Sequence, residues 1–205
     1  MTQQTGTARS LLDAARELFI ALGYDGTSIR AITSRAQANL GAVTYHFGSK
    51  SALYEAVAES VMTPLRDHLV GIAGSGQPPL DRVEALLRGF FEYLRVHPEP
   101  ARLMVQQLAS GRPAPDAVSR IIRTNHDTLT QVLAEGQTDG TIREGNPRFL
   151  ALSIIAQPVW LTLVRHLLQQ TIGIDQDERH TRQDLVETTV RFVRAGLSAQ
   201  LEARR

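Results

Sequence analysis

The residues best suited to contact another molecule lie between Gly26 and Tyr54. This stretch contains Lys50, the only lysine among the 22 lysine and arginine residues of the chain. The aromatic side chains of Tyr45 and Phe47 flank His46 just before that lysine. A cation, hydroxyl groups and small side chains can together grip phosphate oxygens and approach base edges. We therefore interpret the stretch as a candidate nucleic-acid interface.

Helical periodicity predicts the elements that must position these side chains. A first helix carries a regular apolar repeat and should end at Gly23, and Thr27 is a plausible N-cap for a second. After a turn at residues 37–38, Asn39 can cap a third helix. The expected inward positions are Leu11, Ala15, Leu18 and Leu22 in the first helix, Ile29, Ile32 and Ala36 in the second, and Leu40, Val43 and Phe47 in the third.

The third helix should present an unusually small outward face. By the 100° helical step, Gly41, Ala42 and Tyr45 fall opposite its apolar side. Thr44 and His46 flank this face. Glycine and alanine would let the helix backbone come close to a surface. The tyrosine would offer a hydroxyl to phosphate and a ring to sugar or to a thymine methyl group.

Lys50 should lie at the start of a fourth helix capped by Ser49 and running over residues 50–72. Free N–H groups and the helix dipole favour an anion at such a position. Thr27 and Ser28 supply an earlier helix start, so two phosphates could be held on either side of a groove. Each feature also has a plain structural interpretation: Thr27 as a cap only, Tyr45 as an incidental surface residue, His46 as packing. Their combination favours nucleic-acid binding.

The rest of the chain shows helical patterns and no sustained alternation of the kind that strands require, which predicts an all-α protein. Further helices are expected at residues 81–97, 99–110, 116–137, 147–171 and 181–203. The simplest division is a small helix-turn-helix domain at 1–48 and a larger helical domain at 49–205, with the fourth helix joining them.

Composition narrows the function classes. The chain contains no cysteine, which excludes disulfides, thiolate metal sites and cysteine nucleophiles and fits a reducing cytoplasm. The apolar run at 149–164 is interrupted by polar residues and Pro158, so we expect a buried helix and no membrane association. The net charge is +1. Residues 1–50 carry five cations (Arg9, Arg16, Arg30, Arg35, Lys50) against three anions (Asp13, Glu17, Asp25).

Catalytic motifs are not found: the chain shows no nucleophile elbow, P-loop, paired-histidine zinc motif or dinucleotide fingerprint. The six histidines are scattered without ligand-like spacing. We therefore expect no enzymatic activity, no metal and no cofactor. A helical adaptor that binds only other proteins remains an alternative, although it would leave Tyr45 and Lys50 without a role.

Two motifs resemble the DNA-binding domain of the tetracycline-repressor (TetR) family of bacterial regulators. They read LLDAARELFIALGYDGTSIRAIT and VTYHFGSKSALY, and the likeness covers about the first 55 residues. The resemblance implies a homodimeric, ligand-responsive transcriptional regulator. Such a protein is typically a repressor that an effector releases from a pseudo-palindromic operator, and an activator is the alternative.

The resemblance also implies residue roles. Phosphate contacts fall on Thr27, Ser28, Tyr45 and Lys50. Base or backbone contacts fall on Asn39, Leu40, Gly41, Ala42, Thr44 and His46, and Arg30 completes the predicted DNA-binding set. Two positions depart from the family pattern: Gln37 replaces the glycine usual in the turn, which predicts a wider turn or a different tilt of the third helix, and Thr44 replaces a common tyrosine.

For the larger domain the resemblance implies ligand sensing and dimerisation. A stripe in the last helix (Val186, Val190, Val193, Leu197, Leu201) and the apolar helix at 149–164 are the predicted dimer surface; the alternative is that the stripe fills the core of one chain. Polar and aromatic residues in apolar helices predict the effector site: Phe90, Tyr93, Leu94, Met104, Gln107, His126, Gln157 and Trp160. Pro158 is expected to kink its helix beside this site.

Overall fold

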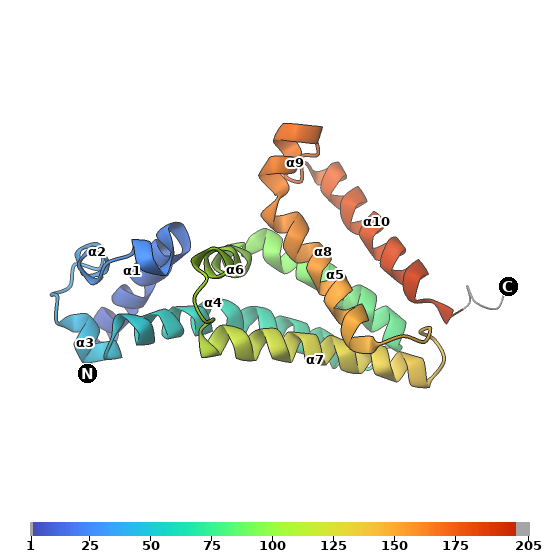
Figure 1. The fold of residues 1–205 in the computed structure, drawn as a ribbon, viewed down its shortest axis with the longest axis horizontal. Coiled ribbons are helices and arrows are strands. Elements are labelled where there is room, and N and C mark those ends of the chain that lie inside the picture. The colour runs from blue at the N-terminus through green and yellow to red at the C-terminus, as the bar shows by residue number, and fades with distance from the viewer. Residues whose placement is uncertain (1, 200–205) are drawn as a thin grey trace. The chain divides into compact units, whose positions relative to one another are not determined.

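The computed structural model of the protein describes residues 2–199 and is all α-helical over that range, as the sequence predicts (Figure 1). Outside the helices, one isolated antiparallel bridge joins Ile142 and Ser198. The helices of the described residues are α1 (Thr2–Gly26), α2 (Ile29–Arg35), α3 (Ala42–Phe47), α4 (Lys50–Ala73), α5 (Pro79–Val96), α6 (Glu99–Ser110), α7 (Asp116–Thr138), α8 (Pro147–Leu163), α9 (Arg165–Ile172) and α10 (Arg179–Leu197).

The chain forms two compact units that do not follow the predicted boundary at residue 48. The first unit contains residues 2–64 and 99–121, and the second contains 65–98 and 122–199. The difference arises because α1–α3 are too small to enclose a core. The first turns of α4, all of α6 and the start of α7 complete it.

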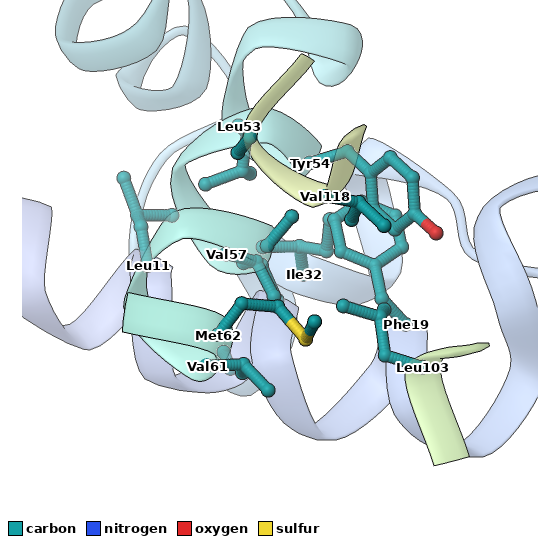
Figure 2. Packing of buried hydrophobic residues seen from close by; sticks show 14 of the residues in the cluster. Leu11, Phe19, Ile32, Leu53, Tyr54, Val57, Val61, Met62, Leu103 and Val118 are labelled. Carbon is teal, nitrogen blue, oxygen red and sulfur yellow. The ribbon is translucent and has the colours of Figure 1, made fainter. Parts of the chain in front are cut away.

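The core of the first unit lies between α1, α2, α3 and these later segments. Phe19 of α1 is fully buried, and its ring meets that of Tyr54 edge to face at 4.9 Å. α1 also packs along α6. Burying a leucine or phenylalanine side chain contributes about 1.5–3 kcal/mol, so this cluster fixes where α2 and α3 lie. Figure 2 shows side chains that meet there from distant parts of the sequence: Leu11, Phe19, Ile32, Leu53, Val57, Leu103 and Val118.

In the second unit, α5 packs against both α8 and α10. The strongly amphipathic α5 buries Leu86, Leu87, Phe90 and Leu94. Ion pairs at the edges of this packing join Arg82 to Glu135 and Arg88 to Glu187. The unit is therefore a helical layer built around α5.

Several helix ends differ from the sequence prediction. α1 begins earlier than its apolar repeat, and Gly23 interrupts it with a φ of 72°, as its predicted stopping role suggests. The expected single helix at 147–171 is two helices with a break at Val164 and a bend of 66°. α8 runs through Pro158, so the sharp change of direction comes six residues after the proline. α10 ends at Leu197 because Ser198 is extended, and residues 200–203 lie outside the described range.

The expectation that the apolar helix at 149–164 is buried is only half correct. Ala151, Ile154 and Pro158 of α8 are buried, but Phe149 and Trp160 are largely exposed. Between residues 2 and 199, no single helix is long and apolar enough to cross a membrane.

Candidate nucleic-acid interface

The start of α2 is capped by Ser28 and not by Thr27. The Ser28 Oγ accepts a hydrogen bond from the Ala31 N–H at 3.0 Å. Thr27 is only 2% exposed, and its hydroxyl donates to the Gly23 carbonyl oxygen at 2.8 Å. The prediction of Thr27 as N-cap is therefore wrong. A buried hydroxyl that already has a partner is also badly placed for a phosphate contact, whereas Ser28 is exposed beside it.

α3 begins at Ala42, later than predicted, with Gly41 as its N-cap residue. Asn39 does not cap it with its side chain; the Asn39 carbonyl accepts from the Ala42 N–H at 3.1 Å. Because Leu40 lies in the turn before the helix, the 100° step does not apply to it, and it is 57% exposed. Ala42 packs beside Val43 in the core and is 7% exposed. The predicted faces of Leu40 and Ala42 are therefore reversed.

The outward side of this short helix nevertheless carries exposed side chains that can contact phosphates and bases. Tyr45 is 72% exposed, and Thr44 and Gly41 are exposed next to it. His46 is half-buried, with its ring edge-on to Tyr45 at 4.9 Å and to Phe47 at 6.5 Å. The exposed surface made by Asn39, Leu40, Gly41, Thr44 and Tyr45 is called the recognition surface below.

The turn between α2 and α3 keeps a left-handed residue even though glycine is missing. Gln37 has a φ of 52°, the only positive φ of a non-glycine residue in the described chain. Its N–H donates to the Ser34 carbonyl at 3.2 Å, and the Ala38 N–H donates to the Thr33 carbonyl at 2.9 Å. A side chain in this conformation costs roughly 1–2 kcal/mol. Gln37 therefore carries backbone strain within the turn.

Lys50 is the first residue of α4, whose N-terminus Ser49 caps by accepting from the Ala52 N–H at 3.1 Å. The Lys50 ammonium lies over the Tyr24 ring, 4.2 Å from its centroid. The guanidinium of Arg112 lies 4.4 Å from the same centroid and pairs with Asp25 at 3.2 Å. The lysine is therefore held in place by packing.

This environment changes the acidity of Lys50. Partial burial lowers its pKa, the nearby Arg112 lowers it further, and Asp25 opposes both. Sequence reasoning did not find Tyr24 or Arg112, since a cation–π contact with residue 112 depends on how α6 returns to α1. The cluster of Tyr24, Asp25, Lys50 and Arg112 is called the cation cluster below.

The other cations of residues 1–50 divide into two kinds. Arg35 pairs with Glu17 at 2.7 Å and Arg16 with Glu99 at 3.1 Å, so both are neutralised. Arg9 and Arg30 are exposed and, within residues 2–199, form no ion pair. Arg30 lies on α2, close in sequence to Ser28. The positive charge available to a polyanion thus comes from Arg9, Arg30 and Lys50.

Comparison with known families finds a match for each of two separate parts of the chain. Residues 11–57 match the sequence model of the bacterial regulatory proteins of the tetR family. Residues 79–193 match the model of the tetracyclin repressor-like C-terminal domain. The chain belongs to the TetR family. It is accordingly a ligand-responsive, DNA-binding regulator of transcription.

One curated relative and two solved structures resemble this chain at low sequence identity. The transcriptional regulator RutR of Escherichia coli K12 is 26% identical over 153 residues, which covers 72% of this chain and 70% of RutR. The crystal structure of AibR with isovaleryl coenzyme A and operator DNA has a TM-score of 0.70 at 18% identity, over 90% of this chain and 96% of AibR. HlyIIR, a hemolysin II transcriptional regulator, has a TM-score of 0.68 at 18% identity, over 95% and 98%. These two structures share its fold.

The residues predicted to form an effector site are dispersed. Met104 and Gln107 belong to the first unit, where Gln107 is buried and its amide donates to the Arg112 carbonyl at 2.6 Å. The other six belong to the second unit but differ in setting: Phe90 and Leu94 are buried, Tyr93, His126 and Gln157 are half-buried, and Trp160 is 63% exposed. His126 Nε2 contacts the Arg148 carbonyl oxygen at 3.0 Å, and the Gln157 amide donates to the Ser153 carbonyl at 3.2 Å.

Two cavities in the second unit include members of that set. Phe90 lines a cavity of about 20 Å³, which is room for about one water molecule. Leu94 lines a larger cavity of about 270 Å³. The predicted group therefore does not assemble as one site, because each residue was chosen for its own helix without knowledge of which helices meet.

The predicted dimer stripe of α10 faces its own chain. Val190, Val193 and Leu197 are buried where α10 packs on α5, and Val186 is half-buried there; Leu201 lies outside the described residues. For Val190, Val193 and Leu197, the alternative interpretation, that the stripe fills an intramolecular core, is correct. Large apolar side chains that remain exposed on α8 and α10 are Phe149, Leu152, Trp160 and Phe192.

Proposed function

We propose that this TetR-family protein is a homodimeric repressor that a small-molecule effector releases from a pseudo-palindromic operator. The observation that carries the proposal is the exposed recognition surface, whose last residue Tyr45 lies five residues before Lys50, a cation held at the start of α4. Because the operator would lie in bacterial DNA, the cytoplasm is the expected compartment.

The proposed DNA contacts are of two kinds: contacts to the phosphate backbone and contacts to base edges. Tyr45 and Thr44 offer hydroxyls to phosphate, Lys50 adds a charge where the N-terminus of α4 already favours an anion, and Ser28 and Arg30 offer a second contact on α2. Base readout rests on fewer groups: the Asn39 amide, the Thr44 hydroxyl and the methyl groups of Leu40. With so few base-reading groups, DNA shape should carry part of the specificity.

The proposed dimer uses α8 and α10, as the sequence suggests, but on α10 through Phe192 and not through the buried stripe. Phe149, Leu152, Trp160 and Phe192 are exposed apolar side chains that a second copy would cover. Two-fold symmetry would set the two recognition surfaces about 34 Å apart, one helical turn of DNA. An effector that favours another spacing would weaken operator binding through a coupling of about 1–3 kcal/mol.

DNA binding tests the proposal directly. Fluorescence anisotropy on duplexes selected from random DNA should show that Lys50→Ala and Tyr45→Ala each weaken binding about ten-fold on every sequence, because they remove phosphate contacts. Lys50→Ala should also reduce the slope of log affinity against log salt by about one.

The matched control is Arg143→Ala, which removes one exposed positive charge from the second unit. It should leave affinity nearly unchanged. Equal losses in Lys50→Ala and Arg143→Ala would reduce the effect of Lys50 to net charge, and no loss in Lys50→Ala or Tyr45→Ala would contradict the assigned interface.

A further inference from the structure

The larger cavity of the second unit is lined by residues of α5 and α10, the adjoining ends of α8 and α9, and the loop before α10, and its approximate volume of 270 Å³ is near the lower end for small-molecule sites. In Figure 1, α9 stands beside the N-terminal end of α10. The lining has an apolar part and a charged part. The apolar part includes Phe91 and Leu94, which are buried, and Val186, which is half-buried.

The charged lining is unbalanced by one positive charge. Four arginines and three carboxylates border the cavity. Three of the arginines each pair with one of the three carboxylates: Arg88 with Glu187, Arg95 with Glu92, and Arg165 with Asp177. The fourth, Arg182, forms no ion pair within the described chain.

Arg182 is half-buried and only weakly engaged. One of its terminal nitrogens, Nη1, donates to the carbonyl oxygens of Gln176 and Asp177 at 3.4 and 3.3 Å. Its positive charge is close enough to help lower the pKa of Glu92, but Glu92 is already bound by Arg95 through both of its oxygens. A guanidinium in this setting retains donors for an incoming carboxylate, which it can bind in a fork.

We propose that this cavity binds a small amphipathic monocarboxylate, with its carboxylate on Arg182 and its apolar chain against Phe91, Leu94 and Val186. One negative charge on the ligand balances the one unpaired positive charge, and the apolar lining accepts the remainder. The inference rests on the proposed function in one respect, since it identifies this ligand as the effector. Its location differs from the predicted effector residues, of which only Leu94 lines the cavity.

Octanoate is a suitable probe because it combines one carboxylate with a short chain that suits the volume. Isothermal titration calorimetry of the full chain without DNA should give a dissociation constant below about 1 mM for octanoate. Octan-1-ol and octylamine should bind at least about ten-fold more weakly, since neither has a negative charge that can form an ion pair with a guanidinium. Equal affinity for all three, or no binding of octanoate, would overturn the proposal.

Variants locate the site. Arg182→Gln should weaken octanoate about ten-fold or more and leave octan-1-ol unchanged, and Arg182→Lys should recover only part of the octanoate affinity, because an ammonium keeps the charge but not the fork. Arg179→Gln is the matched control, because Arg179 is exposed on the same helix and does not line the cavity. Val186→Phe should fill the cavity and weaken both ligands. A loss caused equally by Arg179→Gln and Arg182→Gln would contradict the site.

A second arm separates this inference from the proposed function. Octanoate should weaken operator binding by the wild-type chain and by Arg179→Gln, but not by Arg182→Gln. If octanoate binds in calorimetry and operator affinity does not change, the cavity is not the effector site. If the chain binds no DNA, the proposed function fails while calorimetry still decides whether the cavity takes the carboxylate.

Discussion

Gln37 shows how one residue in the turn before α3 can affect the free energy of unfolding. Its φ of 52° is comfortable for glycine and strained for glutamine. Gln37→Gly should therefore raise the free energy of unfolding by about 0.5–1 kcal/mol, the relieved strain being partly offset by the greater freedom of glycine in the unfolded chain. Urea denaturation followed by circular dichroism measures this difference.

Ser34→Gly is the matched control, since Ser34 is exposed within α2. There glycine should lower stability by about 0.5–1 kcal/mol. A loss of stability in both variants would show that Gln37 is not strained.

Lys50 should make DNA binding sensitive to alkaline pH. Its pKa is lowered chiefly by burial, so its charge is lost as pH rises at a lower pH than for an ordinary lysine. Operator affinity should therefore begin to fall below the usual lysine range of about 10.4. Anisotropy titrations from about pH 7.5 upward can detect the onset.

Lys50→Arg is the control for this titration, because arginine keeps its charge throughout the range. That variant should show a later decline or none. Identical pH profiles for the two proteins would mean that another group titrates.

At the scale of helices, one side of α10 contributes to the core of its own chain, and the other side is available for the proposed dimer contact. Leu197 is buried on the side that packs on α5, whereas Phe192 is exposed on the other. Leu197→Ala should lower the free energy of unfolding by about 2–5 kcal/mol, as large-to-small substitutions in cores do. Thermal or urea denaturation measures the loss.

Phe192→Glu should instead act on assembly. A charge placed within an apolar contact between copies must be desolvated, so the dimer should dissociate while helix content is retained. Sedimentation velocity ultracentrifugation separates monomer from dimer. The matched control is Arg191→Glu, the exposed neighbouring residue. An unchanged dimer for Phe192→Glu would move the interface away from this face of α10.

For the whole molecule, arginine–carboxylate pairs predict the response to acid. Hydrogen bonds from Arg88 lower the pKa of Glu187, and those from Arg82 lower the pKa of Glu135. A depressed folded-state pKa contributes stability that is complete above the unfolded value of 4.5 and is lost as pH falls through the folded value. Unfolding temperature should thus be level above about pH 4.5 and decline below it.

Arg88→Gln should make that decline shallower, because Glu187 would then titrate near its unfolded pKa. Arg102→Gln, an exposed arginine without an ion pair in the described chain, is the control and should keep the wild-type slope. Calorimetric melts across the acid range compare the three proteins. The same slope for all of them would show that Glu187 does not contribute.

Local rules in the sequence determined much of this protein. Apolar periodicity and caps predicted an all-α chain, the start of α4 behind Ser49, and the bounds of α6. The motifs from Leu11 to Tyr54 pointed to the correct family. These features could be predicted because helix periodicity, capping and turn formation depend on residues that are close together in the sequence.

Only the tertiary structure decided which face met which partner. It buried Ala42 and exposed Leu40, turned the Val190 stripe of α10 toward α5, and brought Arg112 and Lys50 to one Tyr24 ring. It also left Arg182 as the one arginine of its cavity without a carboxylate. Burial and pairing depend on contacts between residues tens of positions apart. The amino-acid sequence indicates which residues are able to make such contacts, and the tertiary packing determines which of the contacts form.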